Sequence, residues 1–350
     1  MKLILSLIII VLATSLCAQI PVYYNDVNLN LTGMSLKNEL TSKITATHTN
    51  QISYTQVWTV LKQSDLDPTN SEDVILVYGW DDTDNIEDND RTRDKDFNGG
   101  SNTGEWNREH VYPKSLANPA LGTSGAGADA HNLRPADVDF NGDRGSLKFG
   151  SGSGTAGNIG GNWYPGEEWK GDVARIYMYM YVRYTTRCKP GNACVGSPVS
   201  IDLNMVDLLL QWNINDPVSD FERTRNNTIY NTQGNRNPFI DNAYLATLIW
   251  GGGDAENVWT ELGIDNIETD DIQFSIYPNP SIDGRVNVKF NSIQSISKIE
   301  VFDISGKIVN TFDITSTSSK TLIINDLLTG VYFLKVTTLT AVLTKKIVIK

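Results

Sequence analysis

The segment that decides the fold runs from Trp106 to Gly145. It reads Trp-Asn-Arg-Glu-His-Val-Tyr-Pro-Lys-Ser at residues 106–115, Asp-Ala-His-Asn-Leu-Arg-Pro-Ala-Asp at 129–137 and Asn-Gly-Asp-Arg-Gly at 141–145. Two of the three histidines of the chain, His110 and His131, fall within one stretch of 22 residues here. Histidine is the side chain whose ordinary pKa lies nearest to neutral pH, so this segment is the first place to look for proton-transfer chemistry.

The segment combines the four kinds of group that metal-assisted hydrolysis of a phosphodiester needs. These are a base for water, oxygen ligands for a divalent ion, a cation for the phosphate and a scaffold that fixes them. Taken singly, each element has a plainer explanation, because a Glu-His pair is common at solvated strand ends and Asn-Gly-Asp is typical of a turn. Their joint order along the chain favours the functional explanation.

These motifs resemble those of the endonuclease I family of extracellular and periplasmic nucleases. Further matches are Gly171-Asp172-Val173-Ala174-Arg175, Trp212, Asp216-Pro217-Val218 and the run Gln-Gly-Asn-Arg-Asn-Pro-Phe-Ile-Asp at residues 233–241. The resemblance covers roughly residues 35–250. It implies a β-hairpin followed by a helix that together grip one Mg²⁺, the ββα-metal or His-Me finger.

The resemblance also implies roles for individual residues. His110 is expected to be the general base that deprotonates water, with Glu109 a direct or water-mediated metal ligand and Asn141 the second ligand. Mg²⁺ suits this set because it prefers oxygen ligands and takes only one or two protein groups; Mn²⁺ and Ca²⁺ are alternatives. The metal would neutralise charge on the phosphate and on the departing 3′-oxygen, so the products are expected to carry 5′-phosphates.

The other polar residues of the motifs receive lesser roles. Arg144 is expected to hold the scissile or an adjacent phosphate, and an ion pair with Asp143 or Asp139 is the alternative. Asn132 is expected to tie the hairpin loop by backbone hydrogen bonds, whereas His131 has no assigned role. Weaker candidates for phosphate contact are Arg134, Arg175 and Arg236, and Arg236 has a structural role in its turn as the alternative.

Three parts are predicted along the chain: a signal peptide at residues 1–18, a nuclease domain at 19–265 and a small β-sandwich at 266–350. Residues 1–18 have a basic start, an apolar stretch too short to span a membrane and a small residue at the end. That pattern is typical of a secretory signal peptide. Cys17 leaves lipidation as an alternative, although Leu16 before it fits that modification poorly.

The C-terminal part consists of short alternating runs of Val, Ile, Phe and Thr, which predict the β-sandwich. It resembles the sorting domain of the type IX secretion system in four stretches: Ile276-Tyr277-Pro278-Asn279-Pro280, residues 301–307, residues 328–333 and residues 345–350. This resemblance implies that the type IX machinery exports the protein from the periplasm to the medium or the cell surface. An ordinary binding module is the alternative.

The first domain is predicted to be mainly helical, which makes the fold class α+β with an all-β end. Helix-like apolar spacing extends over residues 35–62, 172–184, 205–212 and 220–229, and residues 74–78 are typical of a buried strand. Residues 101–161 are rich in Gly, Asn and Asp and are expected to be mostly loop. No other apolar run reaches membrane-spanning length, and we expect a monomer.

The net charge of −12 argues against nonspecific coating of a polyanion, but the charge is segregated. Residues 81–96 carry eight acidic and three basic residues, whereas residues 170–189 carry five basic residues and one acidic residue. The acidic run lacks EF-hand spacing, so a solvated loop is favoured over a Ca²⁺ site. Cys188 and Cys194 flank a Pro-Gly turn and predict one disulfide, with a metal site as the weaker alternative.

The sequence as a whole predicts a secreted endonuclease that cuts DNA, with RNA as a further candidate substrate. No base preference is expected, because the catalytic groups address phosphate. The alternative from another class is an exported binding protein with a degenerate finger, and the intact Glu109, His110 and Asn141 argue against it. A metalloprotease is disfavoured because the chain has no His-Glu-x-x-His motif.

Overall fold

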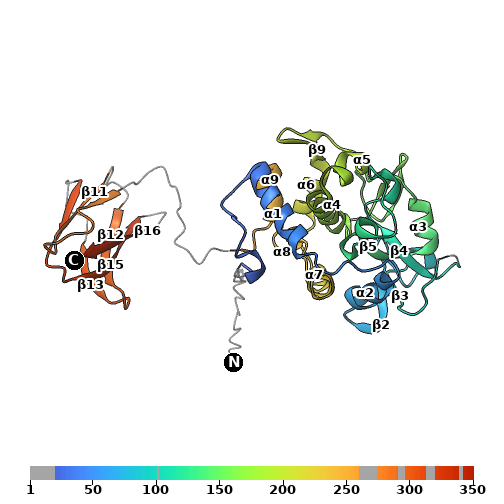
Figure 1. The fold of residues 1–350 in the computed structure, drawn as a ribbon, viewed down its shortest axis with the longest axis horizontal. Helices are drawn as coiled ribbons and strands as arrows, with labels where there is room; N and C mark the ends of the chain where they lie inside the picture. The colour runs from blue at the N-terminus through green and yellow to red at the C-terminus, as the bar shows by residue number, and fades with distance from the viewer. Residues whose placement is uncertain (1–19, 101, 260–273, 291–295, 313–319, 339–341) are drawn as a thin grey trace, which may run out of the picture. The chain divides into compact units, whose positions relative to one another are not determined.

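The structure of the chain is a computed structural model that describes residues 20–100, 102–259, 274–290, 296–312, 320–338 and 342–350. The chain divides into two compact units at residue 260, and each is described by itself (Figure 1). The predicted signal peptide at residues 1–18 and the predicted domain boundary at residue 265 lie outside the described residues. Within the described residues, no helix is both long enough and apolar enough to cross a membrane.

Helices are the main regular elements of the first unit, as the sequence predicted. They are α1 (Gly33–Thr47), α2 (Gln56–Ser64), α3 (Val138–Arg144), α4 (Lys170–Tyr184), α5 (Pro190–Ala193), α6 (Asp207–Asn215), α7 (Asp220–Gln233), α8 (Pro238–Asp241) and α9 (Tyr244–Trp250). Short 3-10 turns are η1 (Val22–Tyr24), η2 (Glu87–Asn89), η3 (Lys114–Leu116), η4 (Gly125–Gly127), η5 (Ala130–Asn132) and η6 (Thr185–Cys188). The α+β fold class is therefore confirmed for this unit.

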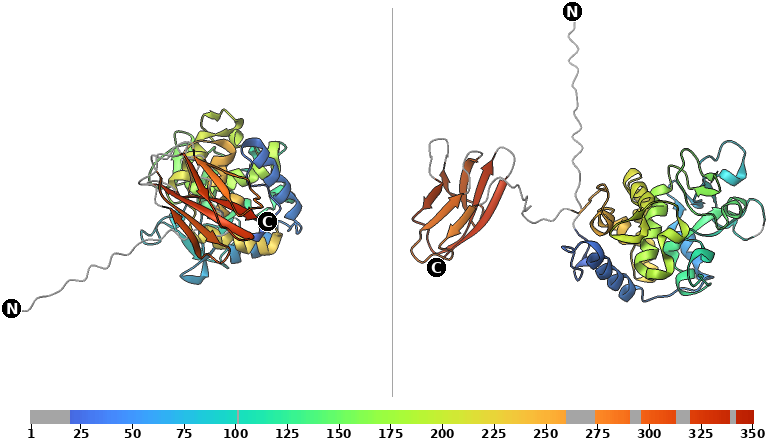
Figure 2. Two further views of the ribbon diagram at one scale, coloured as in Figure 1. Left: turned by 90° about the vertical axis from the view of Figure 1, so that its left-hand side faces the viewer. Right: turned by 90° about the horizontal axis from the view of Figure 1, so that it is seen from above.

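Helix α4 is the centre of the first unit (Figures 1 and 2). Every residue from Gly171 to Val182 is buried, which is typical of a helix enclosed on all sides by other elements. It packs against α1, α6 and α8. The helix presents tyrosines as well as aliphatic side chains to the core, so its hydroxyl groups need buried partners, and one of these partners supports the site described below.

The strands of the first unit form small antiparallel sheets. They are β1 (Leu66–Asp67), β2 (Asn70–Ile75) and β3 (Thr92–Asp94) in one sheet, β4 (Trp106–His110) with β5 (Leu133–Asp137), β6 (Gly157–Ile159) with β7 (Asn162–Tyr164), and β8 (Pro198–Val199) with β9 (Asp202–Val206). In the β4–β5 pair Trp106 lies opposite Asp137 and His110 lies opposite Leu133. This register places the end of β4 beside the start of β5.

The β4–β5 hairpin leads directly into α3, which completes the β-hairpin and helix that the resemblance implied. Asp137 begins the helix, because its Oδ1 atom accepts hydrogen bonds from the backbone N–H groups of Asp139 (2.8 Å) and Phe140 (2.9 Å). A carboxylate at this position satisfies N–H groups that the first turn of a helix leaves free. The last residue of β5 thus fixes the direction in which α3 leaves the hairpin.

The second unit is a small β-sandwich, as predicted (Figure 2). One sheet has the order β10 (Phe274–Tyr277), β11 (Val286–Phe290), β14 (Thr321–Ile324), and the other has the order β13 (Ile308–Phe312), β12 (Ile296–Asp303), β15 (Gly330–Thr338), β16 (Val342–Ile349). Alternate side chains of β11, namely Val286, Val288 and Phe290, are buried. They join side chains of the other sheet in a single apolar core.

Two element predictions differ from the structure in detail. The strand predicted at residues 74–78 ends at Ile75, and the following buried residues turn, with Tyr78 at a φ of 76°. Met205 and Val206 belong to β9, so the helix predicted from residue 205 begins at Asp207. In both cases apolar residues continue past the end of an element, because burial does not require regular backbone.

The predicted disulfide is not formed. Cys188 and Cys194 are buried free thiols. The segment between them forms the helical turn α5 where the prediction needed a tight Pro-Gly turn. Burial raises the pKa of both thiols to about 12, which makes them poor nucleophiles and poor metal ligands at neutral pH.

Candidate active site

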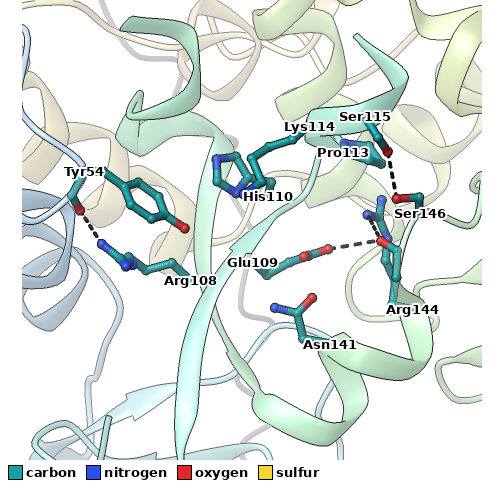
Figure 3. A pocket seen from close by; sticks show the side chains of 11 residues that line it. Tyr54, Arg108, Glu109, His110, Pro113, Lys114, Ser115, Asn141, Arg144 and Ser146 are labelled. Atoms are coloured by element: carbon teal, nitrogen blue, oxygen red, sulfur yellow. Dashed lines mark hydrogen bonds and ion pairs between the residues drawn. The ribbon is translucent and has the colours of Figure 1, made fainter. Parts of the chain in front are cut away.

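A polar cavity of about 300 Å³ lies beside the β4–β5 hairpin and α3 (Figure 3). Its lining includes Glu109 and His110 from β4 and Asn141 and Arg144 from α3. These are the four residues to which the sequence gave the catalytic and metal-binding roles. The remaining lining residues are Tyr54, Arg108, Pro113, Lys114, Ser115, Gly145 and Ser146.

His110 is held in one orientation and one tautomer. Its Nε2 atom lies 2.8 Å from the carbonyl oxygen of Gly127. Because a carbonyl only accepts hydrogen bonds, the ring proton is on Nε2 and the lone pair is on Nδ1. Among the described residues no donor bonds to Nδ1. The ring also stacks on Tyr54, with ring centroids 5.6 Å apart and planes 25° apart.

The charge state of His110 suits a base. The side chain is 6% exposed. The pKa of His110 is lowered to about 4, chiefly by burial; the hydrogen bond to the Gly127 carbonyl opposes this shift, and the nearby cations Lys114, Arg108 and Arg144 add to it. The imidazole is therefore neutral, and able to accept a proton, throughout the neutral range.

The carbonyl that orients the imidazole belongs to a loop fixed by the buried carboxylate of Asp129. Oδ1 of Asp129 accepts from the backbone N–H of His131 at 3.0 Å and from the side chain of Gln233 at 2.9 Å. Oδ2 accepts from the hydroxyl groups of Tyr179 and Tyr184 at 2.7 and 2.8 Å. The loop is thus tied to the central helix α4 and to α7, which makes the position of the carbonyl a property of the core.

Glu109 is buried, and its contacts fall on one oxygen. Oε1 accepts a hydrogen bond of 2.9 Å from the Tyr78 hydroxyl and lies 3.4 Å from Nε of Arg144. Neither contact engages Oε2. Burial raises the pKa of Glu109, while Arg144 and Tyr78 oppose that shift. A bound cation would favour the ionised carboxylate further.

Asn141 turns its carbonyl oxygen toward Glu109. Its Nδ2 atom donates a 2.5 Å hydrogen bond to Oδ1 of Asn107, which fixes the orientation of the amide. Figure 3 shows the oxygen of Asn141 on the side of the Glu109 carboxylate. A carboxylate oxygen and an amide oxygen facing one polar cavity form the hard donor set that Mg²⁺ takes, so the residues present fit such an ion.

Arg144 lines the cavity, but its charge is compensated by an ion pair within the protein. It is 1% exposed and donates to the carbonyl oxygens of Val111 (2.8 Å) and Gly145 (3.1 Å). Its ion-pair partner is Glu109, and not Asp143 or Asp139 as the alternative prediction had it. The buried guanidinium therefore pairs with the Glu109 carboxylate and is not free to bind an anion in the cavity.

The three weaker arginine candidates do not line the cavity. Arg134 and Arg175 are each 1% exposed. The ion pairs are Arg134 Nε to Asp65 at 2.6 Å, Arg175 Nε to Glu222 at 2.6 Å and Arg236 to Asp241 at 2.6 Å. The fold compensates all three charges, so the structure gives these arginines structural roles in place of the phosphate contacts that the sequence suggested.

Asn132 and His131 lie behind the cavity wall. Asn132 Oδ1 accepts from the backbone N–H of Tyr112 at 2.8 Å and Nδ2 donates to its carbonyl at 3.2 Å, which ties the loop as its supporting role requires. His131 is buried with Nε2 3.2 Å from the carbonyl oxygen of Asn235. Burial lowers the pKa of His131 to about 4. Its place in the core explains why no catalytic role could be assigned.

The acidic run at residues 81–96 largely organises its own loop. Carboxylates of Asp81, Asp82 and Asp84 accept backbone N–H groups within the run. Asp88 approaches Asp137 and Asp139, and the oxygens of these three carboxylates lie within 4.8 Å of one another. The run therefore packs against the start of α3, outside the lining of the cavity.

Sequence reasoning missed four residues around the cavity: Tyr54, Tyr78, Arg108 and Lys114. Arg108 and Lys114 stand within the quoted motif, so their closeness to His110 was a usable signal. Tyr54 and Tyr78 are remote from that motif along the chain, and only the fold brings them to His110 and Glu109.

Comparison with known families divides the chain in the same way as the structure. Residues 32–244 match the family described as Endonuclease I. Residues 275–350 match the family described as a secretion system C-terminal sorting domain. The first match contains every residue of the cavity lining, and the second covers the β-sandwich except for Phe274.

Characterised relatives include two proteins named extracellular ribonuclease. The one from Bacillus subtilis (strain 168) is 43% identical over 236 residues, which is 63% of this chain and 75% of the relative. The one from Bacillus amyloliquefaciens is 41% identical over 245 residues, 65% of this chain and 78% of the relative. An extracellular deoxyribonuclease from Aeromonas hydrophila is 29% identical over 124 residues, 32% of this chain and 48% of the relative.

Proposed function

The chain belongs to the endonuclease I family and ends in a secretion-system sorting domain, and on this premise we propose that it is a metal-dependent endonuclease that hydrolyses phosphodiester bonds of nucleic acids. It is a secreted nuclease, exported to the medium or the cell surface. The observation that carries the metal-dependent mechanism is the convergence of Glu109, His110 and Asn141 on one polar cavity.

His110 is the general base of the proposed mechanism. Its Nε2–H is committed to the Gly127 carbonyl, so Nδ1 is the nitrogen that takes the proton from the attacking water. The stacked Tyr54 ring and the Gly127 carbonyl hold the imidazole in place, which reduces the conformational entropy lost on the way to the transition state.

Glu109 and Asn141 would hold a divalent metal, with Mg²⁺ as the first candidate and Mn²⁺ and Ca²⁺ as alternatives. Such an ion supplies charge stabilisation for the phosphate and for the departing 3′-oxygen, consistent with 5′-phosphate products. Tyr78 and Arg144 position the Glu109 carboxylate through its Oε1 atom. Arg144 is thus proposed as a positioning residue, since its buried guanidinium is engaged by the protein.

We propose both RNA and DNA as substrates. Two relatives above 40% identity are named ribonucleases, and a more distant relative is named a deoxyribonuclease. The catalytic groups address the phosphodiester that both polymers share, so base preference is not expected. We also propose that residues 1–18 are a cleaved signal peptide, and that the nuclease domain extends over residues 19–265 and the sorting domain over 266–350.

The test is cleavage of plasmid DNA and of a structureless RNA by the purified protein with Mg²⁺. We expect multiple internal cuts, loss of activity in EDTA, and a fall of about 10²- to 10⁴-fold in kcat for His110→Ala. Asn192→Ala serves as the matched control, because Asn192 lies outside the cavity lining. Undiminished cleavage by His110→Ala, or full activity in EDTA, would overturn the proposal.

A further inference from the structure

Three cations line the cavity, and only one of them is compensated. Arg144 is buried against Glu109. Arg108 and Lys114 also line the cavity, but within the described part of the chain neither has a carboxylate within ion-pair distance. The protein has a net charge of −12, yet these two cations face the cavity beside the proposed base without an acidic partner. They indicate that an anion of the ligand is their counter-charge.

Arg108 packs against two aromatic rings. Its guanidinium carbon lies 3.6 Å from the centre of the Tyr54 ring and 4.2 Å from the centre of the Trp58 ring. One terminal nitrogen donates to the backbone carbonyl of Tyr54. Its Nε atom is buried and has no hydrogen-bond partner among the described residues.

This arrangement fixes the plane of the guanidinium while most of its N–H edge stays unused. Contact with aromatic rings leaves the N–H edge of a guanidinium available, and hydrogen bonds to a phosphate use that edge. No carboxylate of the described residues lies within ion-pair distance of Arg108, whereas Arg144 has Glu109 beside it. A phosphate oxygen would supply the missing negative charge.

Lys114 provides the second cation from the other end of the motif. It begins η3 directly after Pro113, and its side chain is exposed. Figure 3 shows Lys114 and Arg108 on different sides of the His110 imidazole. Both side chains line the same cavity as that imidazole, beside the point where water would be activated.

We propose that Arg108 and Lys114 bind backbone phosphates of the substrate strand around the His110 cavity, Arg108 from its place against the Tyr54 and Trp58 rings and Lys114 from the exposed start of η3. This inference rests on the proposed function and names the groups that bind its substrate. It replaces Arg134, Arg175 and Arg236 as the phosphate-binding cations. The anion that they bind is a nucleic acid, because the same cavity holds the groups proposed for phosphodiester hydrolysis.

Binding is tested in the full chain carrying His110→Ala, so that the probe stays intact. The probe is a short fluorescein-labelled DNA duplex, and the dissociation constant is measured by anisotropy over a series of salt concentrations. Each phosphate contact contributes about 0.9 to the slope of log affinity against log salt. We expect Arg108→Ala and Lys114→Ala each to lower the slope by about that amount, and the double variant by about twice as much.

Lys62→Ala is the matched control. Lys62 lies on α2, four residues after Trp58, but its charge is compensated by Asp96 at 2.8 Å. Its removal should leave the slope unchanged. Lys114→Arg should retain the slope, because the charge is kept. Arg108→Lys should keep most of the slope but bind more weakly, because the stacked planar group is lost.

A purely structural role for Arg108 predicts a different result. In that case Arg108→Ala would lower the unfolding temperature while the salt slope stayed at the value of the parent, and the inference would be overturned for Arg108; an unchanged slope in Lys114→Ala would overturn it for Lys114. Failure of the proposed function is seen separately, as absence of cleavage by the wild-type chain. A reduced slope in a chain that does not cleave would still support phosphate binding.

Discussion

The Nε2 atom of His110 and the carbonyl oxygen of Gly127 are 2.8 Å apart, and this hydrogen bond decides which ring nitrogen is basic. Gly127 itself has no room for a side chain, because a Cβ atom there would lie 1.8 Å from the backbone oxygen of Gly122. The position of the carbonyl therefore depends on glycine.

We expect Gly127→Ala to reduce kcat at least about tenfold, since the loop must shift and the imidazole loses its fixed tautomer. Initial rates on a labelled oligonucleotide measure this. Gly122→Ala is the control, because a Cβ atom at Gly122 would meet nothing within 4 Å. Equal rates for Gly127→Ala and the wild type would show that the carbonyl is not needed.

Tyr78→Phe should weaken metal binding without removing a proposed ligand. The hydroxyl of Tyr78 donates to Oε1 of Glu109 at 2.9 Å, and loss of such a supporting bond costs about 10- to 100-fold in metal affinity or activity. The measurement is the Mg²⁺ concentration that gives half-maximal cleavage. Tyr181→Phe removes a buried hydroxyl bonded to Asp202, away from the cavity, and should leave that concentration unchanged. If Tyr78→Phe and Tyr181→Phe need the same Mg²⁺ concentration for half-maximal cleavage, Tyr78 does not support metal binding.

Mg²⁺ should stabilise the first unit through Glu109. A ligand that binds only the folded state raises the unfolding temperature as its concentration rises above its dissociation constant. We expect this rise in the wild type and its loss in Glu109→Gln, measured by thermal melting with and without EDTA. Asp139→Asn probes the other acidic group at the start of α3. A rise abolished by Asp139→Asn and retained by Glu109→Gln would move the metal to that cluster.

Stability should fall in mild acid because of buried histidines. Burial lowers the pKa of His131 to about 4, whereas an unfolded histidine has a pKa of about 6.5. The unfolded chain therefore binds the proton first as the pH falls. With respect to His131, the free energy of unfolding keeps its full value above pH 6.5. Protonation of His131 in the unfolded chain lowers it by about 3 kcal/mol as the pH falls to 4.

Tryptophan fluorescence can follow this unfolding in the first unit alone, since all eight tryptophans lie between residues 58 and 259. His110 has a pKa lowered to about the same value and contributes a similar decline. The buried His48 also has a pKa lowered by burial, so His131→Gln should reduce the wild-type loss between pH 6.5 and 4 without abolishing it. Identical pH dependence in the two proteins would contradict the assignment.

The residues of the candidate site could be predicted because they are concentrated in a short segment. Glu109, His110 and Asn141 stand in motifs whose order is itself informative, and the β-hairpin and α3 that carry them follow the same order. The supporting groups were not predictable in this way. Tyr54 and Tyr78 contact the site from elements that no local pattern connects with it.

The arginines show why a cation cannot be assigned from its own segment. Arg175 and Arg134 were plausible phosphate contacts until the structure showed Glu222 and Asp65 beside them. Those partners come from distant parts of the chain, and their approach is decided by packing of the whole unit. Arg108 looked ordinary in the sequence because the aromatic rings that hold it lie on a different element.

The four hydrogen bonds to Asp129 limit how the loop around Gly127 and His131 can open. The partners of Asp129 include hydroxyl groups on the enclosed helix α4, so the loop that carries the Gly127 carbonyl is anchored to that helix. Amide hydrogen exchange at His131 should then proceed only through unfolding of the whole unit. A nuclease built this way would offer proteases outside the cell no early cleavage point beside its own active centre.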